Sequence, residues 1–281
     1  MIIMNVIFNS HYIHFHNMNS PALTILQLTD LHILPNPEDT LLGVRTEKYF
    51  HHVLDHAFKD GKYDVILLSG DLAQSPCEES YNRILETVEP YQLPVLCLPG
   101  NHDDFSLMQH LFDSPAIHCQ KQIIFGNWQI ILLNSQIIHS ESGHLAQSEL
   151  DFLETCLNEH TQLFTLIAVH HHCVPSGSSW LDTMQIDNSA ELLNIVKNHP
   201  NVKVITTGHI HQELHQKIGN ITILGTPSTC FQFALNSADF ALDTQSPGYR
   251  TIHLYDNGDM TTNVYRIDTP LEGLMLTSEG Y

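Results

Sequence analysis

The chain has few basic residues for its length. Its 281 residues include 11 Lys and Arg against 31 Asp and Glu, which gives a formal net charge of −20 with His neutral. A surface this acidic repels the phosphate backbone of nucleic acids and the headgroups of anionic lipids. We therefore expect neither a nucleic-acid-binding protein nor one that binds membranes through charge.

Long apolar runs are also missing. No stretch approaches the about 18 apolar residues of a membrane-spanning helix, so no membrane span is expected. The first 20 residues contain no Lys or Arg and lack the charged start of a secretory signal. We interpret residues 1–20 as a disordered extension and predict that residues 21–281 form a single domain.

The cysteines show no metal-binding or disulfide pattern. There are six of them, and none forms a CxxC motif, which argues against a zinc knuckle or a disulfide framework. Unpaired thiols are typical of a reducing compartment, so we expect a cytoplasmic protein.

The hydrophobic pattern alternates between strands and helices. Buried strands are predicted at residues 23–29, 64–70, 94–100, 165–171, 203–209 and 221–228, and helices at 45–60, 78–89, 105–112, 147–158 and 188–198. Turn residues at 126–127 and 257–258 predict two hairpins, over residues 122–135 and 249–267. The chain is therefore predicted to be an α/β protein (an α+β sandwich). Two mixed β-sheets would stack face to face with helices outside, in four αββα layers.

Five of the predicted strands end in residues that bind metals. The segments are QLTDLH (Asp30, His32), LLSGDL (Asp71), CLPGNHDD (Asn101, His102), IAVHHH (His170, His171, His172) and TTGHIHQ (His209, His211). Ligands of open α/β sheets gather just past the carboxyl ends of the strands. In extended backbone, residues i and i+2 point to the same side, so each DxH or HxH pair could converge on one centre.

The donor atoms are oxygen and nitrogen, without cysteine sulfur. This mixture suits Fe, Mn, Zn or Co with open coordination positions better than a closed structural zinc site. The candidates outnumber the ligands that one ion takes from protein, so two ions sharing a carboxylate fit better. Two such ions point to hydrolysis of a phosphate ester.

The same segments carry a family resemblance. The series DxH, GD, GNHD, a His after a strand and GHxH, over residues 24–211, resembles the signature of the calcineurin-like metallophosphoesterases. Nearly the whole chain beyond the extension resembles the bacterial class III 3′,5′-cyclic-AMP phosphodiesterases. That closer likeness lies in LTDLH, SGDLAQ, LPGNHD, HHHCVPSGSSWLD, GHIHQEL and TPSTCFQF.

The resemblance implies a role for each site residue. It implies a first metal ion bound by Asp30, His32 and His211, a second bound by Asn101, His170 and His209, and Asp71 between them. Fe²⁺ or Mn²⁺ would be the natural ions, and Zn²⁺ or Co²⁺ would also suit. The substrate-binding residues would be His32, Asp71, Asn101, His102 and His211, with His102 as the catalytic residue that stabilises or protonates the leaving oxygen.

Three further residues are candidates for the substrate pocket. His171 and His172 would line the pocket or orient the ligands. Trp180 would stack on a nucleobase or else simply pack within its loop.

The function that the resemblance implies is hydrolysis of cyclic AMP to 5′-AMP. A metal-activated hydroxide would attack the phosphorus in line. One alternative is a broader phosphodiesterase that cleaves glycerophosphodiesters or 2′,3′-cyclic nucleotides with the same metal core. Another is a non-catalytic module that binds metal or nucleotide, although such a module would be expected to lose ligands that this chain retains.

Overall fold

A computed structural model describes residues 21–114 and 116–280, so the prediction for residues 1–20 lies outside the described residues. The helices are α1 (Thr46–Asp60), α2 (Glu78–Val88), α3 (Phe105–Leu111), α4 (Gln147–Glu159), α5 (Ser179–Asp182) and α6 (Ser189–Lys197), with a 3₁₀ turn at Glu89–Tyr91. The strands are β1 (Leu23–Leu28), β2 (Val65–Ser69), β3 (Val95–Leu98), β4 (Ile117–His118), β5 (Gln122–Phe125), β6 (Trp128–Leu133), β7 (Phe164–Val169), β8 (Val202–Thr207), β9 (Leu214–Ile218), β10 (Ile221–Gly225), β11 (Gln232–Phe233), β12 (Leu242–Asp243), β13 (Gly248–Leu254) and β14 (Met260–Arg266).

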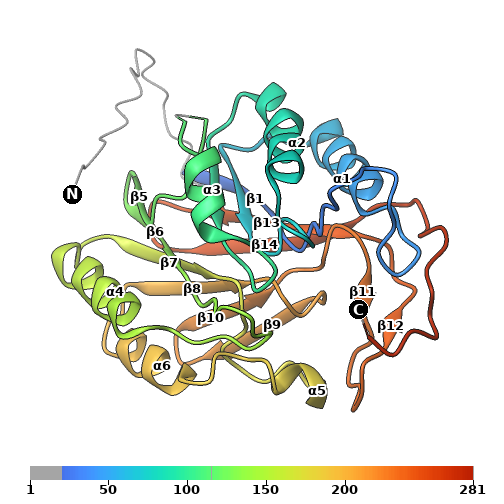
Figure 1. Ribbon diagram of the computed structural model, residues 1–281. Coiled ribbons are helices and arrows are strands. Elements are labelled where there is room, and N and C mark those ends of the chain that lie inside the picture. Colours follow the sequence, from blue (N-terminus) through green and yellow to red (C-terminus); the bar gives the residue numbers. More distant parts are fainter. Residues whose placement is uncertain (1–20, 115, 281) are drawn as a thin grey trace.

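Twelve of the strands form two mixed sheets, as the sequence predicted, each with six strands, while β11 and β12 pair with each other separately. The first has the order β14-β13-β1-β2-β3-β4 and the second the order β5-β6-β7-β8-β10-β9. Helices α1, α2 and α3 lie on one side of the pair, and α4 and α6 lie on the other (Figure 1). Both predicted hairpins are present, as the antiparallel pairs β5–β6 and β13–β14.

Alternation along the strands explains why the sheets stack. In β1, Ile25 packs into the core between the sheets, whereas Leu26 and Leu28 pack into the core under α1 and α2. The second sheet meets the inner core with residues such as Trp128 and Leu166. Because the central strands are apolar on both faces, each sheet needs a cover on both sides, and the four layers provide it.

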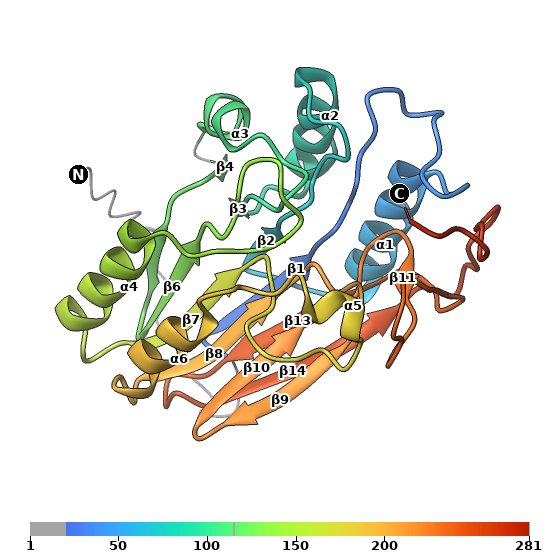
Figure 2. The ribbon, with the colours of Figure 1, turned by 60° about the horizontal axis from the view of Figure 1, so that its bottom comes forward.

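The parallel strands set the position of the site. β1, β2 and β3 are mutually parallel in the first sheet, as are β6, β7 and β8 in the second. The two sheets lie against each other, so the loops that follow these strands share one edge of the molecule (Figure 2).

Buried polar residues link the two sheets close to this edge. Gln27 on β1 donates to Ser69 Oγ at 2.9 Å, and its Oε1 accepts from Thr206 Oγ1 of β8 at 2.6 Å. Arg250 on β13 is 1% exposed, and it donates to the carbonyls of Gly225 (2.7 Å) and Leu214 (3.3 Å) in the second sheet. Burial lowers the pKa of Arg250 to about 10, which leaves the guanidinium charged at neutral pH.

No helix among the described residues is long and apolar enough to cross a membrane.

Replacing Arg250 by Met should lower the free energy of unfolding by about 2–4 kcal/mol, because it leaves buried carbonyls without a donor. Urea denaturation of the purified protein measures this change. Arg45→Met is the control, since that side chain is 44% exposed and forms an ion pair with the exposed Glu38. An Arg250→Met variant as stable as the control would show that the buried guanidinium does not hold the sheets together.

Candidate metal centre

All seven predicted ligands lie together at the shared edge of the sheets. Asp30 and His32 follow β1, Asp71 follows β2, and Asn101 follows β3. His170 follows β7, and His209 and His211 follow β8. Each is buried except Asn101, which is half-buried. Donor atoms of Asp30, His32 and His211 lie within 4.8 Å of one another, and so do those of Asp30, Asp71 and His170.

The distances within the cluster are short. His32 Nε2 lies 3.2 Å from His211 Nε2, which in turn lies 3.3 Å from Asp30 Oδ1. Asp71 Oδ2 lies 3.3 Å from His170 Nε2 and 3.9 Å from His32 Nε2, so this carboxylate stands between two histidines. On the far side of the cluster, His209 Nδ1 lies 3.1 Å from the side-chain oxygen of Asn101.

The backbone is left-handed at five of the seven predicted ligands. The φ angles are 53° at Asp30, 47° at His32, 50° at Asp71, 64° at His209 and 47° at His211. The sequence-based argument that paired ligands converge through extended backbone was therefore wrong in its geometry, although the pairs do converge. Left-handed residues other than glycine are strained and persist only where their surroundings fix them.

Backbone hydrogen bonds fix these strained turns. Asp30 N–H donates to the Gly70 carbonyl and His32 N–H to the Asp71 carbonyl, each at 3.0 Å. Gly70 has a φ of +96°, and a Cβ there would stand 2.3 Å from His170 Nδ1. The close approach of strand and histidine thus requires glycine at this position.

Carbonyl and amide oxygens orient the imidazole rings. His170 Nδ1–H donates to Ser69 O at 2.9 Å, and His211 Nδ1–H donates to Phe231 O at 2.8 Å. His32 Nδ1–H donates to Gln74 Oε1 at 2.6 Å. When these three rings are neutral, Nε2 is therefore unprotonated in each, and its lone pair points into the cluster. Two lone pairs 3.2 Å apart repel each other, and a cation between them removes that repulsion. The donor set thus fits metal ions, as expected for ligands held by outer partners.

Charges within the cluster shift its pKa values. Burial raises the pKa of Asp30 and Asp71, but neighbouring histidines, His211 and His170 respectively, outweigh burial and hold both values below the ordinary one. Burial lowers the pKa of His32 to about 3. Burial also lowers that of His170, but Asp71 and Asp30 outweigh it and raise the value to about 9.

The remaining predicted residues surround the ligands. The backbone N–H of His102 donates to Asp71 Oδ1 at 2.9 Å, and its ring lies edge-on to His32 at 5.1 Å between centroids. Both ring nitrogens of His171 are engaged, Nδ1 with Ser135 Oγ at 2.8 Å and Nε2 with a backbone carbonyl at 3.2 Å.

His172 and Trp180 lie farther out. His172 Nε2 is 3.4 Å from Asp182 Oδ1, and the His172 ring stacks against His209 at 5.7 Å. Trp180 packs edge-on against Phe233 at 4.9 Å and Phe240 at 5.2 Å. Phe233 in turn stacks on His211, so the Phe233 ring lies in contact with both Trp180 and His211.

Asp103 is a site residue that our sequence reasoning missed. It is 6% exposed, and its carboxylate accepts from the backbone N–H groups of Leu72, Ala73 and Gly100 and from the Tyr81 hydroxyl. It thereby ties together the loops that carry Asp71 and Asn101. The two adjacent acidic residues in GNHDD could have drawn attention to Asp103. Their spacing, however, does not show whether such a residue binds a metal or hydrogen-bonds to neighbouring loops.

Comparisons with known proteins show which family the chain resembles. A family model described as calcineurin-like phosphoesterase matches residues 23–213. The chain is 37% identical over 268 residues to the 3′,5′-cyclic adenosine monophosphate phosphodiesterase CpdA of Haemophilus influenzae, which covers 95% of this chain and 98% of that protein. It is 34% identical over 259 residues to the 3′,5′-cyclic-nucleotide phosphodiesterase alr5338 of Nostoc, covering 91% and 97%.

A solved structure shows the same fold. The dimetal phosphatase from Danio rerio superposes with a TM-score of 0.64 at 14% identity, covering 92% of this chain and all of that chain.

Binding of a divalent ion at pH 7 should release about one proton from the protein. The pKa of His170 in the metal-free chain is raised to about 9, so the ring is protonated at pH 7 and the ion must displace that proton. The apparent affinity should accordingly rise as the pH approaches 9. Calorimetric titration with Mn²⁺ in buffers of different ionisation enthalpy measures the release. A binding heat that does not depend on the buffer would contradict the protonated state.

Proposed function

The chain belongs to the calcineurin-like phosphoesterase family, and from that premise we propose that it hydrolyses 3′,5′-cyclic AMP to 5′-AMP. The observation that carries this proposal is near-full-length similarity to proteins named as cyclic-AMP phosphodiesterases, at 37% identity over 95% of the chain. The complete ligand cluster supports catalysis rather than a role as a non-catalytic module.

We assign the ligands of the two ions as follows. Asp30, His32 and His211 would bind the first ion, Asn101, His170 and His209 would bind the second, and Asp71 would bridge them. The position of Asp71 Oδ2 between His32 and His170 supports the bridging role. The mixed oxygen and nitrogen donors favour Fe²⁺ or Mn²⁺, while Zn²⁺ or Co²⁺ would also suit.

Two bound divalent ions would neutralise charge on the phosphodiester and lower the pKa of a water molecule. Hydrolysis adds the water oxygen to phosphorus and breaks the bond to O3′, which must gain a proton. His102 would donate that proton, because its backbone is fixed to Asp71 while its half-buried ring reaches the edge of the cluster. His32, Asp71, Asn101 and His211 would line the phosphate position.

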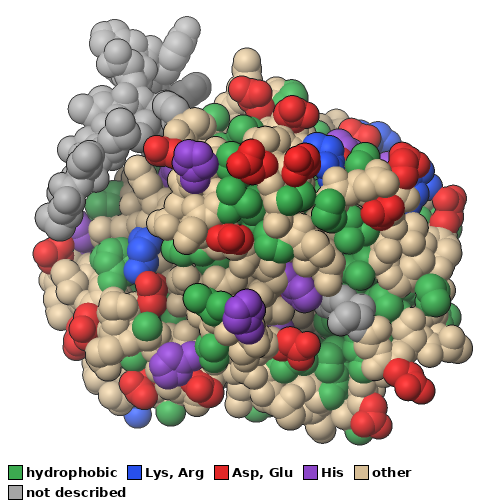
Figure 3. Space-filling model, viewed as in Figure 1, with side chains coloured by type: hydrophobic (Ala, Val, Ile, Leu, Met, Phe, Trp, Pro, Cys, Tyr) green, Lys and Arg blue, Asp and Glu red, His purple; other side chains and the backbone are tan. Residues whose placement is uncertain are grey.

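We further propose that residues 21–281 act as one domain in the cytoplasm. Both sheets supply ligands and share one core between them, which supports a single unit. The six free cysteines are consistent with a reducing compartment. The face seen in Figure 3 carries scattered acidic side chains and few basic ones, which supports a small-molecule substrate rather than a nucleic acid.

Metal-depleted protein reloaded with Mn²⁺ should convert cyclic AMP to 5′-AMP as the sole nucleotide product, measured by chromatography. Bis-p-nitrophenyl phosphate, assayed in parallel, reports on the metal core alone. Cleavage of the artificial diester without cleavage of cyclic AMP would support the proposed metal core but reject cyclic AMP as the substrate. Glycerophosphodiesters or 2′,3′-cyclic nucleotides would then be favoured. Cleavage of neither would reject catalysis.

His102→Ala should lower kcat for cyclic AMP by about 10²–10⁴-fold, the usual contribution of a general acid. The same variant should lose much less activity on bis-p-nitrophenyl phosphate, because p-nitrophenolate leaves without a proton. His110→Ala changes an exposed histidine nearby and serves as the control. Equal losses on both substrates would show that His102 does not protonate the leaving group.

A further inference from the structure

The first group of ligands is assembled from two sheets, whose ligand turns meet where the backbone N–H of His209 donates to the Asp30 carboxylate at 3.1 Å. Asp30 and His32 follow β1 of the first sheet, whereas His211 follows β8 of the second. Residues 228–234, which we call the clamp segment, follow β10 and contact both sides. All of this segment except Ala234 belongs to the TPSTCFQF sequence, and the proposed reaction gives it no role.

The clamp segment binds the Asp30 turn through Ser228. Ser228 Oγ accepts from Cys230 N–H at 2.9 Å, so its own hydrogen is directed to the Asp30 carbonyl, 2.8 Å away. Thr229 N–H adds a bond to the Thr29 carbonyl at 3.2 Å. Ser228 is completely buried, so water cannot replace its hydroxyl, and Asp30 is one of the left-handed residues that need such support.

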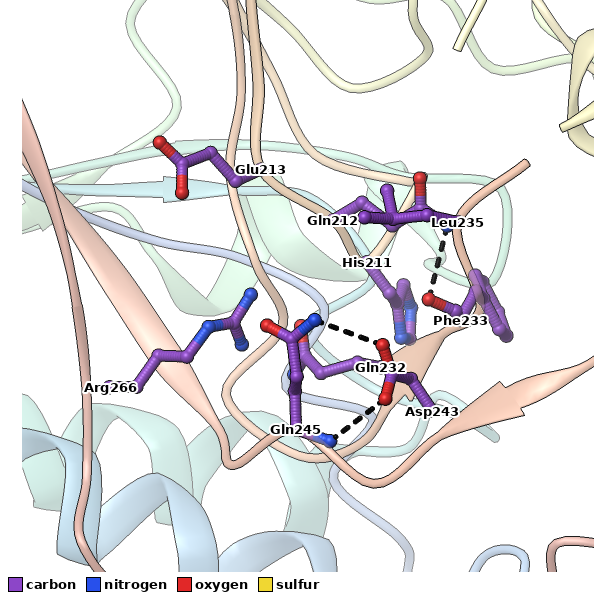
Figure 4. Close-up of a pocket in the computed structure, with 9 residues that line it drawn as sticks. All are labelled: His211, Gln212, Glu213, Gln232, Phe233, Leu235, Asp243, Gln245 and Arg266. Carbon is purple, nitrogen blue, oxygen red and sulfur yellow. Dashed lines mark hydrogen bonds between the residues drawn. The ribbon is translucent and has the colours of Figure 1, made fainter. Parts of the chain in front are cut away.

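The other end of the clamp segment binds the His211 turn. The Phe231 carbonyl accepts from His211 Nδ1–H at 2.8 Å, and the Phe233 ring stacks on the His211 ring at 4.3 Å with an interplanar angle of 24°. Gln212 Nε2 donates to the carbonyls of Phe233 at 3.1 Å and Ala234 at 2.8 Å. Figure 4 shows His211, Gln212 and Phe233 side by side, with the bond to the Phe233 carbonyl dashed.

We propose that the clamp segment fixes Asp30 and His211 relative to each other, and that Ser228 and Phe233 are positioning residues for the first metal ion. This inference rests on the ligand assignment proposed above. The second ion depends on the segment less, because His170 is held by Ser69 and Asn101 lies in the loop anchored by Asp103. Its third proposed ligand, His209, contacts the Asp30 carboxylate and Asn101 rather than the clamp segment. Loss of the Ser228 hydroxyl should therefore lower the affinity for the first ion and leave the affinity for the second unchanged.

The test is calorimetric titration of the metal-free full chain with Mn²⁺, without substrate. Wild type should bind two ions. Ser228→Ala should also bind two, one of them about 10–100-fold more weakly, as is usual when an outer partner of a ligand is removed. Thr229→Val is the matched control, because the adjacent Thr229 hydroxyl is buried without a hydrogen-bond partner among the described residues. This control should keep both affinities.

Phe233→Leu provides an independent variant, since it leaves every bond of Ser228 in place and removes the ring that stacks on His211 and also packs against Trp180. It should lower the affinity for the same ion. If Ser228→Ala does not fold, Phe233→Leu alone tests the proposal. Unchanged affinities in the folded variants, or equal weakening of both ions, would overturn the clamp proposal. A wild-type chain that binds fewer than two ions would instead reject the ligand assignment itself.

Discussion

The structure depends on holding donor atoms that repel each other at one buried edge between two sheets. Nε2 atoms of His32 and His211 face each other at 3.2 Å, and the carboxylates of Asp30 and Asp71 share the same dry space. Protonated His170 offsets only part of this charge, and bound cations would neutralise the rest. The free energy of metal binding would therefore also stabilise this part of the fold.

The same edge explains the unusual backbone. A left-handed residue other than glycine costs about 1–2 kcal/mol, and five proposed ligands adopt that conformation. The turns persist because neighbouring loops supply fixed partners, such as the Gly70 carbonyl for Asp30 N–H. Gly70 in turn brings β2 close to His170, so the strain at one ligand and the position of another have a common cause.

The sequence predicted the layered fold and the gathering of the ligands, because both follow from strong local signals. Apolar runs of strand length identified the central strands, and the carboxyl ends of parallel strands must lie at one edge. Short strands such as β4 and β11 were not predicted, since two residues give no periodicity. The left-handed turns at Asp30 and His209 were also missed, because they occur at residues that usually avoid this conformation.

Contacts between distant segments were beyond the reach of sequence patterns. Nothing local to Arg250 indicates that its guanidinium binds carbonyls of the other sheet, and a lone arginine in a strand usually faces solvent. Two partners of Asp103, Leu72 and Ala73, come from a loop about thirty residues earlier in the chain. For His170, His171 and His172 the sequence alone left the ligand open, and the family resemblance favoured the first. In the structure both nitrogens of His171 are hydrogen-bonded, whereas His170 Nε2 faces Asp71. Donor atoms of His170, His171 and His209 also lie within 4.8 Å of one another, so the choice of His170 stays a prediction.

The net charge of −20 limits how an anionic substrate can be bound. At physiological ionic strength, charges are largely screened beyond about 8 Å, so the acidic surface only weakly opposes the approach of a phosphodiester. Within the cluster, however, Asp30 and Asp71 are ionised and would repel the phosphate at short range. Attraction there must come from the ions that we propose these carboxylates bind. Substrate binding and catalysis therefore depend on the same ions, and residues that position the ligands act on both.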